Sequence, residues 1–476
     1  MARFRPHRMY PGALLAQEAC SYQGATEILA RIGGRLAVMI HSDRDCSNVV
    51  PKTGRPIAGD LPYKFLCTNL KEDELVTGQG GAKLQKALRL VAEAWQPALT
   101  VVLSTCPTVM IGDNLRNIAK KAGRDLGIRV ESELTHGLRP VSPAEVIDKV
   151  FSLLARASLP SRTDLSRRVN LVGLDLREDE LAELRHGLAE LGLEVNAVLS
   201  TDTHLDDFLR AADATYSIQP GPNLLVGYAQ MAQEQWGQQL IEVPIPCGVQ
   251  ATDAFWSKVA AAVGAVDANP LAAERQEAEL AVAQFRSRAA PLLEKGRLRC
   301  AYNVGSVRSF DLRRIALEEL GDLPMFQELG FACDLMIQGP QDAANDLRTA
   351  QVLLDLQCDL PFCLFPAPNN LVQFLGKGVY QLLYGADFLR DQSSQAGVAL
   401  VNHRGTGLGY RQARHNIERV QAALDNGFYS LFEADEHLHD SQVRMELLRP
   451  SERLAQSASL QMAQAGATTQ REGGGG

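Results

Sequence analysis

The sequence predicts an α/β protein built from three Rossmann-like βαβ domains, each with a parallel sheet. The first observation is that short continuous apolar runs rich in β-branched residues alternate with longer stretches rich in Leu, Ala and Glu. Such runs are typical of strands buried on both faces of a parallel sheet, with helices as the crossovers. The second observation is the length of 476 residues with 46% hydrophobic side chains, which suits roughly two to four domains with separate cores.

Residues 1–160 form the first predicted domain. A helix is expected from about Pro11 to Ala30, and Gly24 within it allows close packing. Two apolar runs, Arg35–His41 and Leu99–Ser104, predict the strands that follow. The carboxyl ends of parallel strands meet at one edge of the sheet, where α/β proteins build their sites. Residues just after these two runs are therefore predicted to lie close together.

Residues 161–268 form the second predicted domain, and residues 269–405 form the third, which begins with a long linker helix. Residues 406–476 are expected to be helical at first and to end in a disordered Gly-rich tail. The strands expected in the second domain are Val169–Gly173, Glu194–Leu199 and Ala214–Ile218, with a helix at Glu178–Leu191. Those expected in the third are Leu298–Val304, Ala332–Ile337, Leu360–Phe365 and Val398–Asn402, with helices at Asn269–Leu293 and Asp342–Gln357.

Three cysteines of the first domain, Cys20, Cys46 and Cys106, are the candidate metal ligands. Cys46 comes a few residues after the first predicted strand and Cys106 comes at the end of the second, so both thiols are expected at one sheet edge. The three positions are separated by 26 residues (46 minus 20) and 60 residues (106 minus 46). Zinc hairpins and bacterial ferredoxins use much shorter spacers, so these ligands can meet only through tertiary structure. For any one of them alone, packing as a small hydrophobe is the alternative interpretation.

Composition indicates a large cytoplasmic protein without nucleic-acid or membrane partners. The net charge is −8 and the pI is near 5.7, so no excess of basic residues suggests nucleic acid. No apolar run reaches the roughly 20 residues that span a bilayer, and the amino terminus lacks the apolar core of a signal peptide. Nine cysteines, without short regular spacing, fit reduced thiols and metal ligands better than a disulfide framework.

Four segments of the first domain share their order and spacing with a known family. They are Cys20-Ser-Tyr-Gln-Gly24, the first predicted strand followed by Asp45-Cys46, Leu75-Val-Thr-Gly-Gln-Gly-Gly81 before a Lys/Leu helix, and Thr105-Cys-Pro-Thr-Val-Met-Ile-Gly-Asp113. Together they resemble the amino-terminal domain of nitrogenase component 1 subunits. The resemblance implies a nitrogenase component 1-like fold, with Cys20, Cys46 and Cys106 as thiolate ligands of an iron-sulfur cluster at the interface between two related subunits. That cluster is an 8Fe-7S P-cluster in nitrogenases and a 4Fe-4S cluster in the dark protochlorophyllide reductase, and three thiolates per subunit suit either.

The same resemblance implies partners. A homologous α-type catalytic subunit would complete the cluster in an α2β2 heterotetramer, and a separate ATP-dependent iron-sulfur reductase homodimer would supply electrons. ATP is then expected only on that reductase. The glycine-rich segments Gly78–Gly81 and Gly405–Gly409 fit this expectation, because neither carries the Lys-Ser/Thr of a P-loop. Both are predicted to be tight strand-to-helix turns.

Three segments favour a β-type subunit. In α-type subunits of the family a further cysteine and a late histidine hold the active-site cofactor. The corresponding segment here, Tyr216–Leu224, has no cysteine, whereas Ile241–Phe255 and Gly407–His415 resemble β-type segments. His403 imitates the cofactor histidine but lacks that cysteine partner, and His415 is expected on a helix surface. We therefore expect no catalytic residue in this chain.

The turn before Cys46 departs from the family pattern. Nitrogenase subunits carry His-Gly-Pro/Gly-x-Gly-Cys, whereas this chain has His41-Ser-Asp-Arg-Asp-Cys46. Replacing both glycines, by Ser42 and Asp45, removes conformational freedom and adds charge. This favours a nitrogenase-like reductase outside the nitrogen-fixing groups, with methylthio-alkane reductase, which cleaves carbon-sulfur bonds reductively, as the leading candidate. A divergent nitrogenase subunit and a cofactor-assembly scaffold are the alternatives.

Other cysteines are assigned to packing. Cys67 stands where the family pattern has no ligand, and Cys300 and Cys333 lie in strand-like apolar runs. Cys358 and Cys363 are closely spaced, but the second lies inside an apolar run, so burial is the preferred interpretation over a second metal site.

Overall fold

The computed structural model of the chain describes residues 20–48, 61–138, 141, 143–161, 165, 167–174, 176–220, 225–265, 269–306, 320–375, 379–386, 389–426 and 447–459. The chain forms two compact units. Unit 1 comprises Met1–Ile245 and Asp253–Leu271, and unit 2 comprises Pro246–Thr252 and Ala272–Gly476. Every strand pairing in the described sheets is parallel, so the predicted α/β class with parallel sheets is confirmed.

The first sheet of unit 1 has the strand order β2-β1-β3-β4. Its strands are β1 (Leu36–His41), β2 (Phe65–Cys67), β3 (Leu99–Ser104) and β4 (Val130–Glu133). All residues of β1 and β3 are buried, as expected for central strands covered on both faces. The helices around this sheet are α2 (Ser21–Arg31), α3 (Arg44–Ser47), α4 (Glu72–Val76), α5 (Gly80–Trp95), α6 (Cys106–Met110), α7 (Leu115–Leu126) and α8 (Pro143–Ala155).

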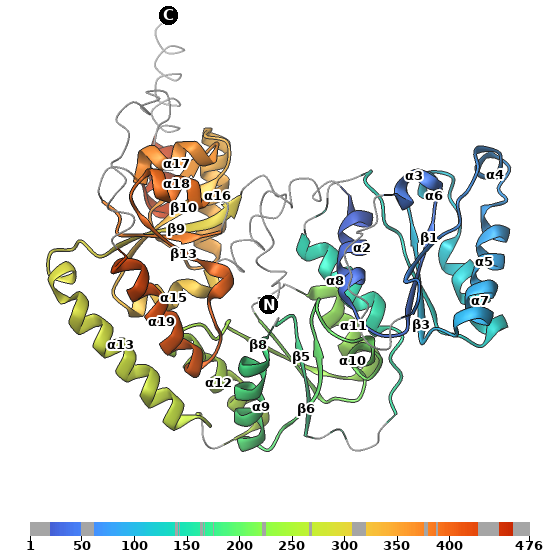
Figure 1. The fold of residues 1–476 in the computed structure, drawn as a ribbon, viewed down its shortest axis with the longest axis horizontal. Coiled ribbons are helices and arrows are strands. Elements are labelled where there is room, and N and C mark those ends of the chain that lie inside the picture. Colours follow the sequence, from blue (N-terminus) through green and yellow to red (C-terminus); the bar gives the residue numbers. More distant parts are fainter. Residues whose placement is uncertain are drawn as a thin grey trace, which may run out of the picture. The chain divides into compact units, whose positions relative to one another are not determined.

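Alternate residues of β1 and β3 serve two different cores. Ala37, Met39 and Val102 share a core with the apolar side chains of α5 and α7. These two helices lie on one side of β1 and β3, and α2 and α8 lie on the other (Figure 1). Val38 and Val101 face α2 and α8 instead. This alternation follows from the two-residue period of a strand and fixes which loops come together at the carboxyl edge.

The second sheet of unit 1 has the order β6-β5-β7-β8. Its strands are β5 (Arg168–Val172), β6 (Glu194–Leu199), β7 (Tyr216–Pro220) and β8 (Gln239–Val243), and its helices are α9 (Glu178–Glu190), α10 (Leu205–Leu209), α11 (Val226–Trp236) and α12 (Val249–Val263), whose first four residues belong to unit 2. The predicted strands and the predicted helix are present: Glu194–Leu199 matches without a shift, and the ends of the others differ by one or two residues.

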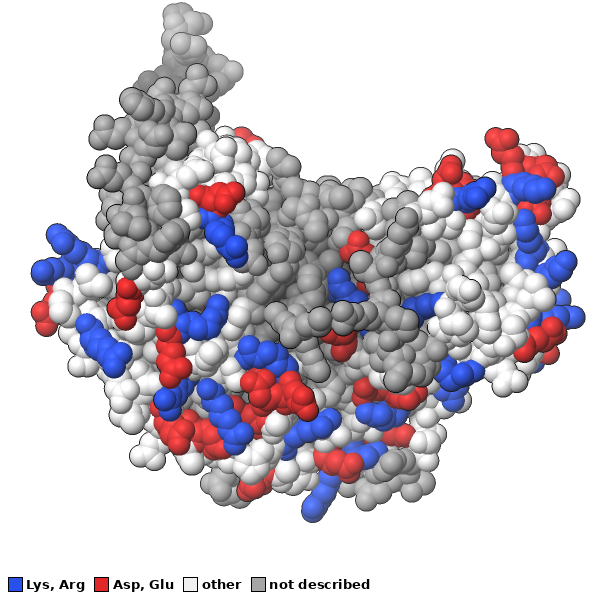
Figure 2. All heavy atoms as spheres, in the orientation of Figure 1, with Lys and Arg blue, Asp and Glu red and all other residues white. Residues whose placement is uncertain are grey.

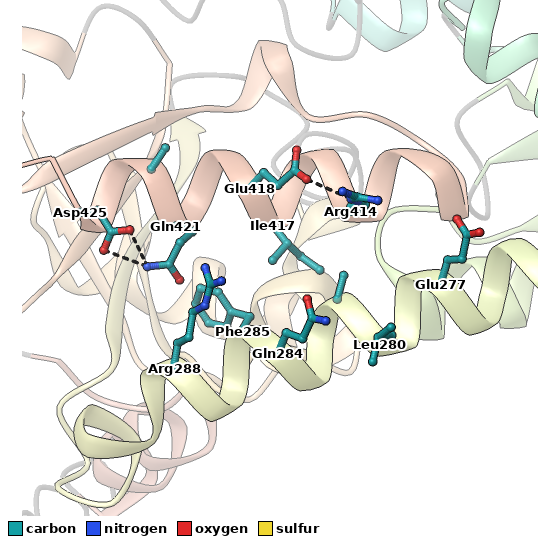
Figure 3. Close-up of a pocket in the computed structure, with 12 residues that line it drawn as sticks. Glu277, Leu280, Gln284, Phe285, Arg288, Arg414, Ile417, Glu418, Gln421 and Asp425 are labelled. Atoms are coloured by element: carbon teal, nitrogen blue, oxygen red, sulfur yellow. Dashed lines mark hydrogen bonds and ion pairs between the residues drawn. The ribbon is translucent and has the colours of Figure 1, made fainter.

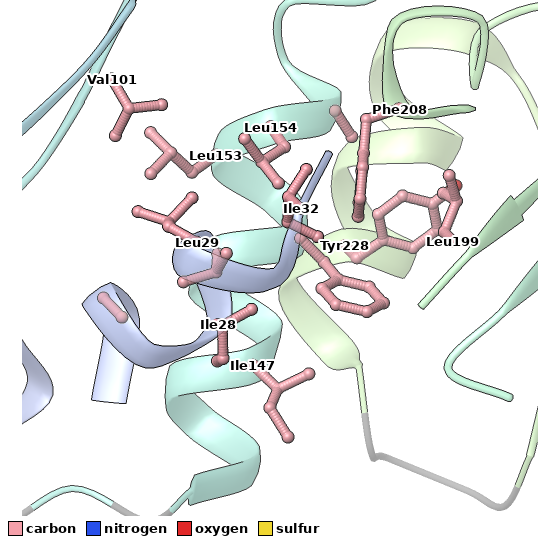
Figure 4. Packing of buried hydrophobic residues seen from close by; sticks show 14 of the residues in the cluster. Ile28, Leu29, Ile32, Val101, Ile147, Leu153, Leu154, Leu199, Phe208 and Tyr228 are labelled. Carbon is pink, nitrogen blue, oxygen red and sulfur yellow. The ribbon is translucent and has the colours of Figure 1, made fainter. Parts of the chain in front are cut away.

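One hydrophobic core joins the elements between the two sheets of unit 1. Figure 4 shows Leu29 of α2 and Ile32, the residue just after α2, beside Leu153 and Leu154 of α8, with Phe208 of α10 close by. Gly24 lies where α2 meets α8, and a Cβ there would be 3.1 Å from Val146 Cγ1, so this glycine does allow the predicted close packing. The core holds α2, and therefore the backbone next to Cys20, firmly against the first sheet.

Unit 2 contains a five-stranded parallel sheet in the order β11-β10-β9-β12-β13. Its strands are β9 (Arg299–Ser306), β10 (Ala332–Gln338), β11 (Phe362–Phe365), β12 (Leu382–Gly385) and β13 (Ala399–Asn402). Its helices are α13 (Ala272–Leu293), α15 (Leu323–Glu328), α16 (Ala343–Asp355), α17 (Pro368–Leu375), α18 (Arg390–Gln395) and α19 (Tyr410–Leu424), with short 3-10 turns at Leu320–Asp322 and His403–Gly405. Residues 450–459 are helical as expected, and the predicted Gly-rich tail lies outside the described residues.

Two predictions about the first domain were wrong. Cys20 is not inside a helix, because α2 begins at Ser21 and Cys20 has the extended backbone of an N-cap residue (φ −137°, ψ 105°); residues 11–19 of the predicted helix lie outside the described residues. Gly78–Gly81 joins two helices, α4 and α5, and is not a strand-to-helix turn. Gly405–Gly409 does connect β13 to α19, as predicted.

Charges of both signs are interspersed on the face of the molecule seen in Figure 2. None of the described helices has the length and apolar character that a membrane crossing demands.

Candidate metal centre

Cys46 and Cys106 follow neighbouring strands. Cys46 lies in the short helix α3 after β1, and Cys106 is the first residue of α6 after β3. The two strands pair in register up to their last residues, His41 and Ser104. The structure therefore brings both cysteine loops to the carboxyl edge of the first sheet, as the sequence predicted.

The turn that carries Cys46 is built by side-chain capping. Asp43 is the N-cap of α3, and its carboxylate accepts hydrogen bonds from the backbone N–H groups of Asp45 (3.2 Å) and Cys46 (3.5 Å). An acidic N-cap satisfies N–H groups that a helix start leaves open. The backbone at Cys46 is thus fixed by the residue three positions before it.

A buried hydroxyl pair joins the Cys46 loop to the Cys106 loop. Thr105 Oγ1 donates to Ser42 Oγ at 2.7 Å, and Ser42 Oγ donates to Asp43 Oδ1 at 3.1 Å. Ser42 and Thr105 are 0% and 1% exposed. Thr105 is also the N-cap of α6 in a capping box with Thr108, so the same residue starts the helix whose first residue is Cys106.

Cys20 is connected to both other cysteines through its neighbours. The Tyr22 hydroxyl donates to the backbone carbonyl of Cys46 at 3.0 Å. Ser21 and His136 exchange hydrogen bonds, and the next residue, Gly137, donates its N–H to Cys106 Sγ at 3.2 Å. The start of α2, the Cys46 turn and the Cys106 helix therefore form one hydrogen-bonded assembly.

The thiols influence one another electrostatically. Burial raises the pKa of the Cys46 thiol, a hydrogen bond with Ser42 lowers it, and the charges of Asp43, Cys106 and Cys20 raise it further. Burial also raises the pKa of Tyr22, and the charges of Cys46, Cys67 and Cys20 add to that rise. The candidate ligands therefore belong to one electrostatic environment.

The donor set consists of soft thiols, the ligand type that iron-sulfur clusters take. Cys20, Cys46 and Cys106 are free thiols, each half-buried. Among the residues that the structure describes, no group of three His, Cys, Asp or Glu side chains converges to hold one metal ion. The N–H of Gly137 directed at Cys106 Sγ is the kind of hydrogen bond that tunes a cluster thiolate.

Cys67 is a fourth thiol near the same edge. It ends β2, and its register partner in β1 is Ile40. Its Sγ donates to the Asp43 carbonyl at 3.3 Å and accepts from the Asn69 N–H at 3.2 Å. These hydrogen bonds describe its surroundings in the fold, and its assignment to packing stays a prediction.

The other candidate residues lie elsewhere. Cys300, Cys333 and Cys363 are buried in strands of unit 2, and Cys358 is half-buried after α16. His403 is 3% exposed after β13, whereas His415 lies on α19 with an exposed side chain, as expected. None of these belongs to the cysteine assembly of unit 1.

A cavity of about 530 Å³ lies in unit 2 between α13 and α19 (Figure 3). Its lining includes the apolar side chains of Leu280, Phe285 and Ile417 and the ion pair Arg414–Glu418. Among the described residues that line it there is no cysteine or histidine. It does not take part in the candidate metal centre.

Sequence reasoning found the three cysteines but missed the residues that connect them. Ser42, Thr105, Ser21 and Tyr22 stand next to the cysteines in sequence or close to them, yet their partners are 24 to 115 residues away. The only signal in the sequence was the small polar residue or aromatic ring near each cysteine.

The fold and the candidate site together indicate the class of protein: a parallel α/β protein with candidate thiolate ligands at one sheet edge. Comparison with known proteins identifies the family. Residues 20–321 match the family described as nitrogenase component 1 type oxidoreductase, which covers more than half of the chain. The chain belongs to this family.

Relatives with several different functions share this family. The nitrogenase iron-molybdenum cofactor biosynthesis protein NifE of Rhizobium meliloti is 25% identical over 323 residues, 65% of this chain and 66% of that protein. NifE of Mesorhizobium japonicum is 26% identical over 48% of this chain and 46% of its own length. One subunit of the light-independent protochlorophyllide reductase of a Bradyrhizobium species is 31% identical over 41% of this chain and 40% of its own.

Solved structures agree in fold. A structure titled nitrogenase Cp1 at pH 6.5 has a TM-score of 0.61 and 14% identity, covering 89% of this chain and 93% of its own. That likeness establishes the fold, which is the nitrogenase component 1-like fold that the sequence predicted. The chain spans about one third to two thirds of the length of the curated relatives it matches.

Proposed function

We propose that this chain is the β-type subunit of a nitrogenase-like reductase and that it binds an interface iron-sulfur cluster through Cys20, Cys46 and Cys106. The observation that supports the proposal is the shared edge of β1 and β3, where a hydrogen bond between Thr105 and Ser42 joins the Cys106 loop to the Cys46 loop. The remaining ligands would come from a homologous α-type subunit, because three half-buried thiols leave the other side of a cluster uncovered.

When bound, such a cluster supplies one-electron transfer at a potential set by its surroundings. The residues of this chain would hold it, shield it from water and tune it. Gly137 would donate a hydrogen bond to the Cys106 thiolate, and the buried Tyr22 would keep the Cys46 backbone in place. Electrons would arrive from a separate ATP-dependent reductase and leave for a catalytic site in the partner subunit.

The proposed reaction of the complex is reductive cleavage of carbon-sulfur bonds in methylthio-alkanes. Its support is the turn His41–Cys46, in which both glycines of the nitrogen-fixing pattern are replaced, together with the absence of a cysteine from the sequence Tyr216–Leu224. A divergent nitrogenase subunit would use the same cluster and the same partners.

A second candidate function is a scaffold on which a nitrogenase-type cofactor is assembled. It is favoured by the repeated similarity to cofactor biosynthesis protein NifE over about half of the chain. Both functions need an iron-sulfur site, but only the reductase turns over a substrate, so an activity assay distinguishes them. A purified complex that reduces a methylthio compound or acetylene, when given the ATP-dependent reductase and ATP, supports the reductase, and one that only transfers its metal to an acceptor protein supports the scaffold.

The experiment that tests the site is cysteine replacement in the complex purified without oxygen. Cys46→Ala and Cys106→Ala should each sharply lower iron and sulfide per complex, because water cannot replace a thiolate at a buried cluster. Cys300→Ala and Cys333→Ala are matched controls, since both are buried in strands of unit 2. They should leave the iron content unchanged and cost about 1 kcal/mol of stability. Equal iron loss in all four variants, or a stable iron-replete monomer, would contradict the proposal.

A further inference from the structure

A buried histidine stands at the end of β1, five residues before Cys46. His41 is fully buried, and its Nε2 lies 2.9 Å from Asp113 Oδ2. Its Nδ1 lies 3.3 Å from the hydroxyl of Thr68, which is itself 4% exposed. Both ring nitrogens therefore have partners inside the protein.

These contacts connect the loops of the cysteine assembly. Asp113 follows α6, the helix that begins with Cys106, and Thr68 follows β2. The backbone carbonyl of His41 also accepts a hydrogen bond from Thr108 Oγ1 of α6 at 3.0 Å. Residue 41 thus holds the Cys106 helix at two points, through its backbone and through its ring.

The chemistry of the partners determines where the proton lies. An ionised carboxylate only accepts hydrogen bonds, so Nε2 carries the hydrogen and donates it to Asp113. Burial lowers the pKa of His41, outweighing the opposing effect of Asp113, so the ring is neutral near pH 7. Nδ1 is then left to accept from the Thr68 hydroxyl. The neutral Nε2–H tautomer is the form that satisfies both contacts.

The first residue of α5 leaves room for this pair. A Cβ at Gly80 would lie 2.7 Å from Asp113 Oδ2 and 3.4 Å from His41 Nε2. Any larger residue at position 80 would displace the His41–Asp113 hydrogen bond, which gives a physical reason for a glycine there. At the neighbouring Gly81 a Cβ would meet only the end of the flexible Ile118 side chain, at 3.0 Å.

We propose that His41 and Asp113 are positioning residues that hold the Cys46 and Cys106 loops at the separation the interface cluster requires, through the Nε2–H to Oδ2 hydrogen bond. This inference rests on the proposed function. In this inference a buried His-Asp pair fixes the separation of the two ligand loops, and neither residue contacts the cluster.

Two substitutions of His41 test its two ring nitrogens one at a time. In His41→Gln the amide nitrogen can take the place of Nε2 and still donate to Asp113, whereas in His41→Asn the shorter amide reaches the Nδ1 position and leaves Asp113 without its donor. We expect the His41→Asn complex to lose iron to a chelator about tenfold faster, in line with the effect of residues that orient metal ligands. Its cluster should also give an altered electron paramagnetic resonance spectrum. His41→Gln should retain the native spectrum and rate.

Controls exclude a general loss of stability. His204→Gln removes another His-Asp contact of unit 1, His204 to Asp206 at 3.1 Å, which is partly exposed, and should change neither readout. Gly80→Ala should behave like His41→Asn, because it displaces the pair without removing either partner, and Gly81→Ala should behave like the wild type. If His41→Asn and His41→Gln have the same spectrum and chelation rate, the inference is wrong.

A measurement without iron keeps the inference separate from the proposed function. In the iron-free chain, alkylation of Cys46 and Cys106 by iodoacetamide, followed by mass spectrometry, reports how firmly the two loops are held. Both rates should rise several-fold in His41→Asn and stay at the wild-type value in His41→Gln, with Cys358 as the internal reference. A wild-type complex without iron would overturn the proposed function, whereas unchanged alkylation in His41→Asn would overturn the positioning role.

Discussion

The hydroxyl pair between Ser42 and Thr105 should contribute measurable stability to the cysteine assembly. Ser42→Ala removes the acceptor at 2.7 Å and leaves the Thr105 hydroxyl, on a residue 1% exposed, without that partner. An unsatisfied buried hydroxyl costs about 1–3 kcal/mol. We therefore expect Ser42→Ala to lower the free energy of unfolding by about 2 kcal/mol, which for a unit of this size is a fall of roughly 6 °C in the unfolding midpoint.

A double-mutant cycle tests the physical reason. Thr105→Val alone loses the hydroxyl pair and the N-cap of α6, for about 2 kcal/mol in total. In the double variant no hydroxyl is orphaned, so the two effects should fall short of additivity by about 1 kcal/mol. Ser47→Ala, at a position outside the core of the same turn, should change stability by less than about 0.5 kcal/mol. Thermal unfolding of the five iron-free chains, wild type and Ser47→Ala included, gives the values, and strict additivity of Ser42→Ala and Thr105→Val would refute the coupling.

Two further predictions concern other parts of the chain. Gly187→Ala should destabilise unit 1 by about 1–3 kcal/mol, because the added Cβ would lie 2.5 Å from Trp256 Cη2 in a closed core; denaturant unfolding measures this, and an unchanged midpoint would show that the indole moves aside freely. His403→Ala should lower the unfolding temperature, since His403 is 3% exposed and its ring lies 6.4 Å from that of Tyr384, yet leave substrate reduction by the complex mostly intact; loss of active-site metal with retention of the interface cluster would instead identify this chain as the α-type subunit.

The central strands were predictable because burial on both faces leaves a strong pattern. Each of β1 and β3 has six consecutive buried residues, so their apolar runs stand out in the sequence. The strand β4 was not foreseen, because Val-Glu-Ser-Glu at Val130–Glu133 is a half-buried edge strand with mostly polar residues. Its place is determined by pairing with β3, which is a tertiary contact.

The candidate site likewise has one part that the sequence predicts and another that depends on tertiary contacts. The cysteines are identified by motifs that are local in sequence, and the sheet topology then explains why Cys46 and Cys106 come together. The connections through His41–Asp113 and Ser21–His136 join residues 72 and 115 positions apart. No periodicity or spacing encodes such pairs, because either partner taken alone is an ordinary polar residue.

The structure changes the interpretation of Ser42 and Asp45, which replace two glycines of the family pattern. The sequence alone suggests that Ser42 and Asp45 restrict the backbone before Cys46. Among the described residues, the only non-glycine positions with positive φ are Asn69, Gln96 and Gln357, so this turn uses conformations open to any residue.

The Cys46 turn is held by the hydrogen bond that Ser42 accepts from Thr105 and by those that the Asp43 carboxylate accepts, and its outer side carries the exposed charges of Arg44 and Asp45. A subunit that covers Cys46 must pair or hydrate both charges, because leaving either one buried and unpaired would cost several kcal/mol, on the order of 3–5. Asp45, at one replaced glycine, and its neighbour Arg44 would therefore restrict which partner surface fits over Cys46, whereas Ser42, at the other, takes part in the hydrogen bonds of the turn.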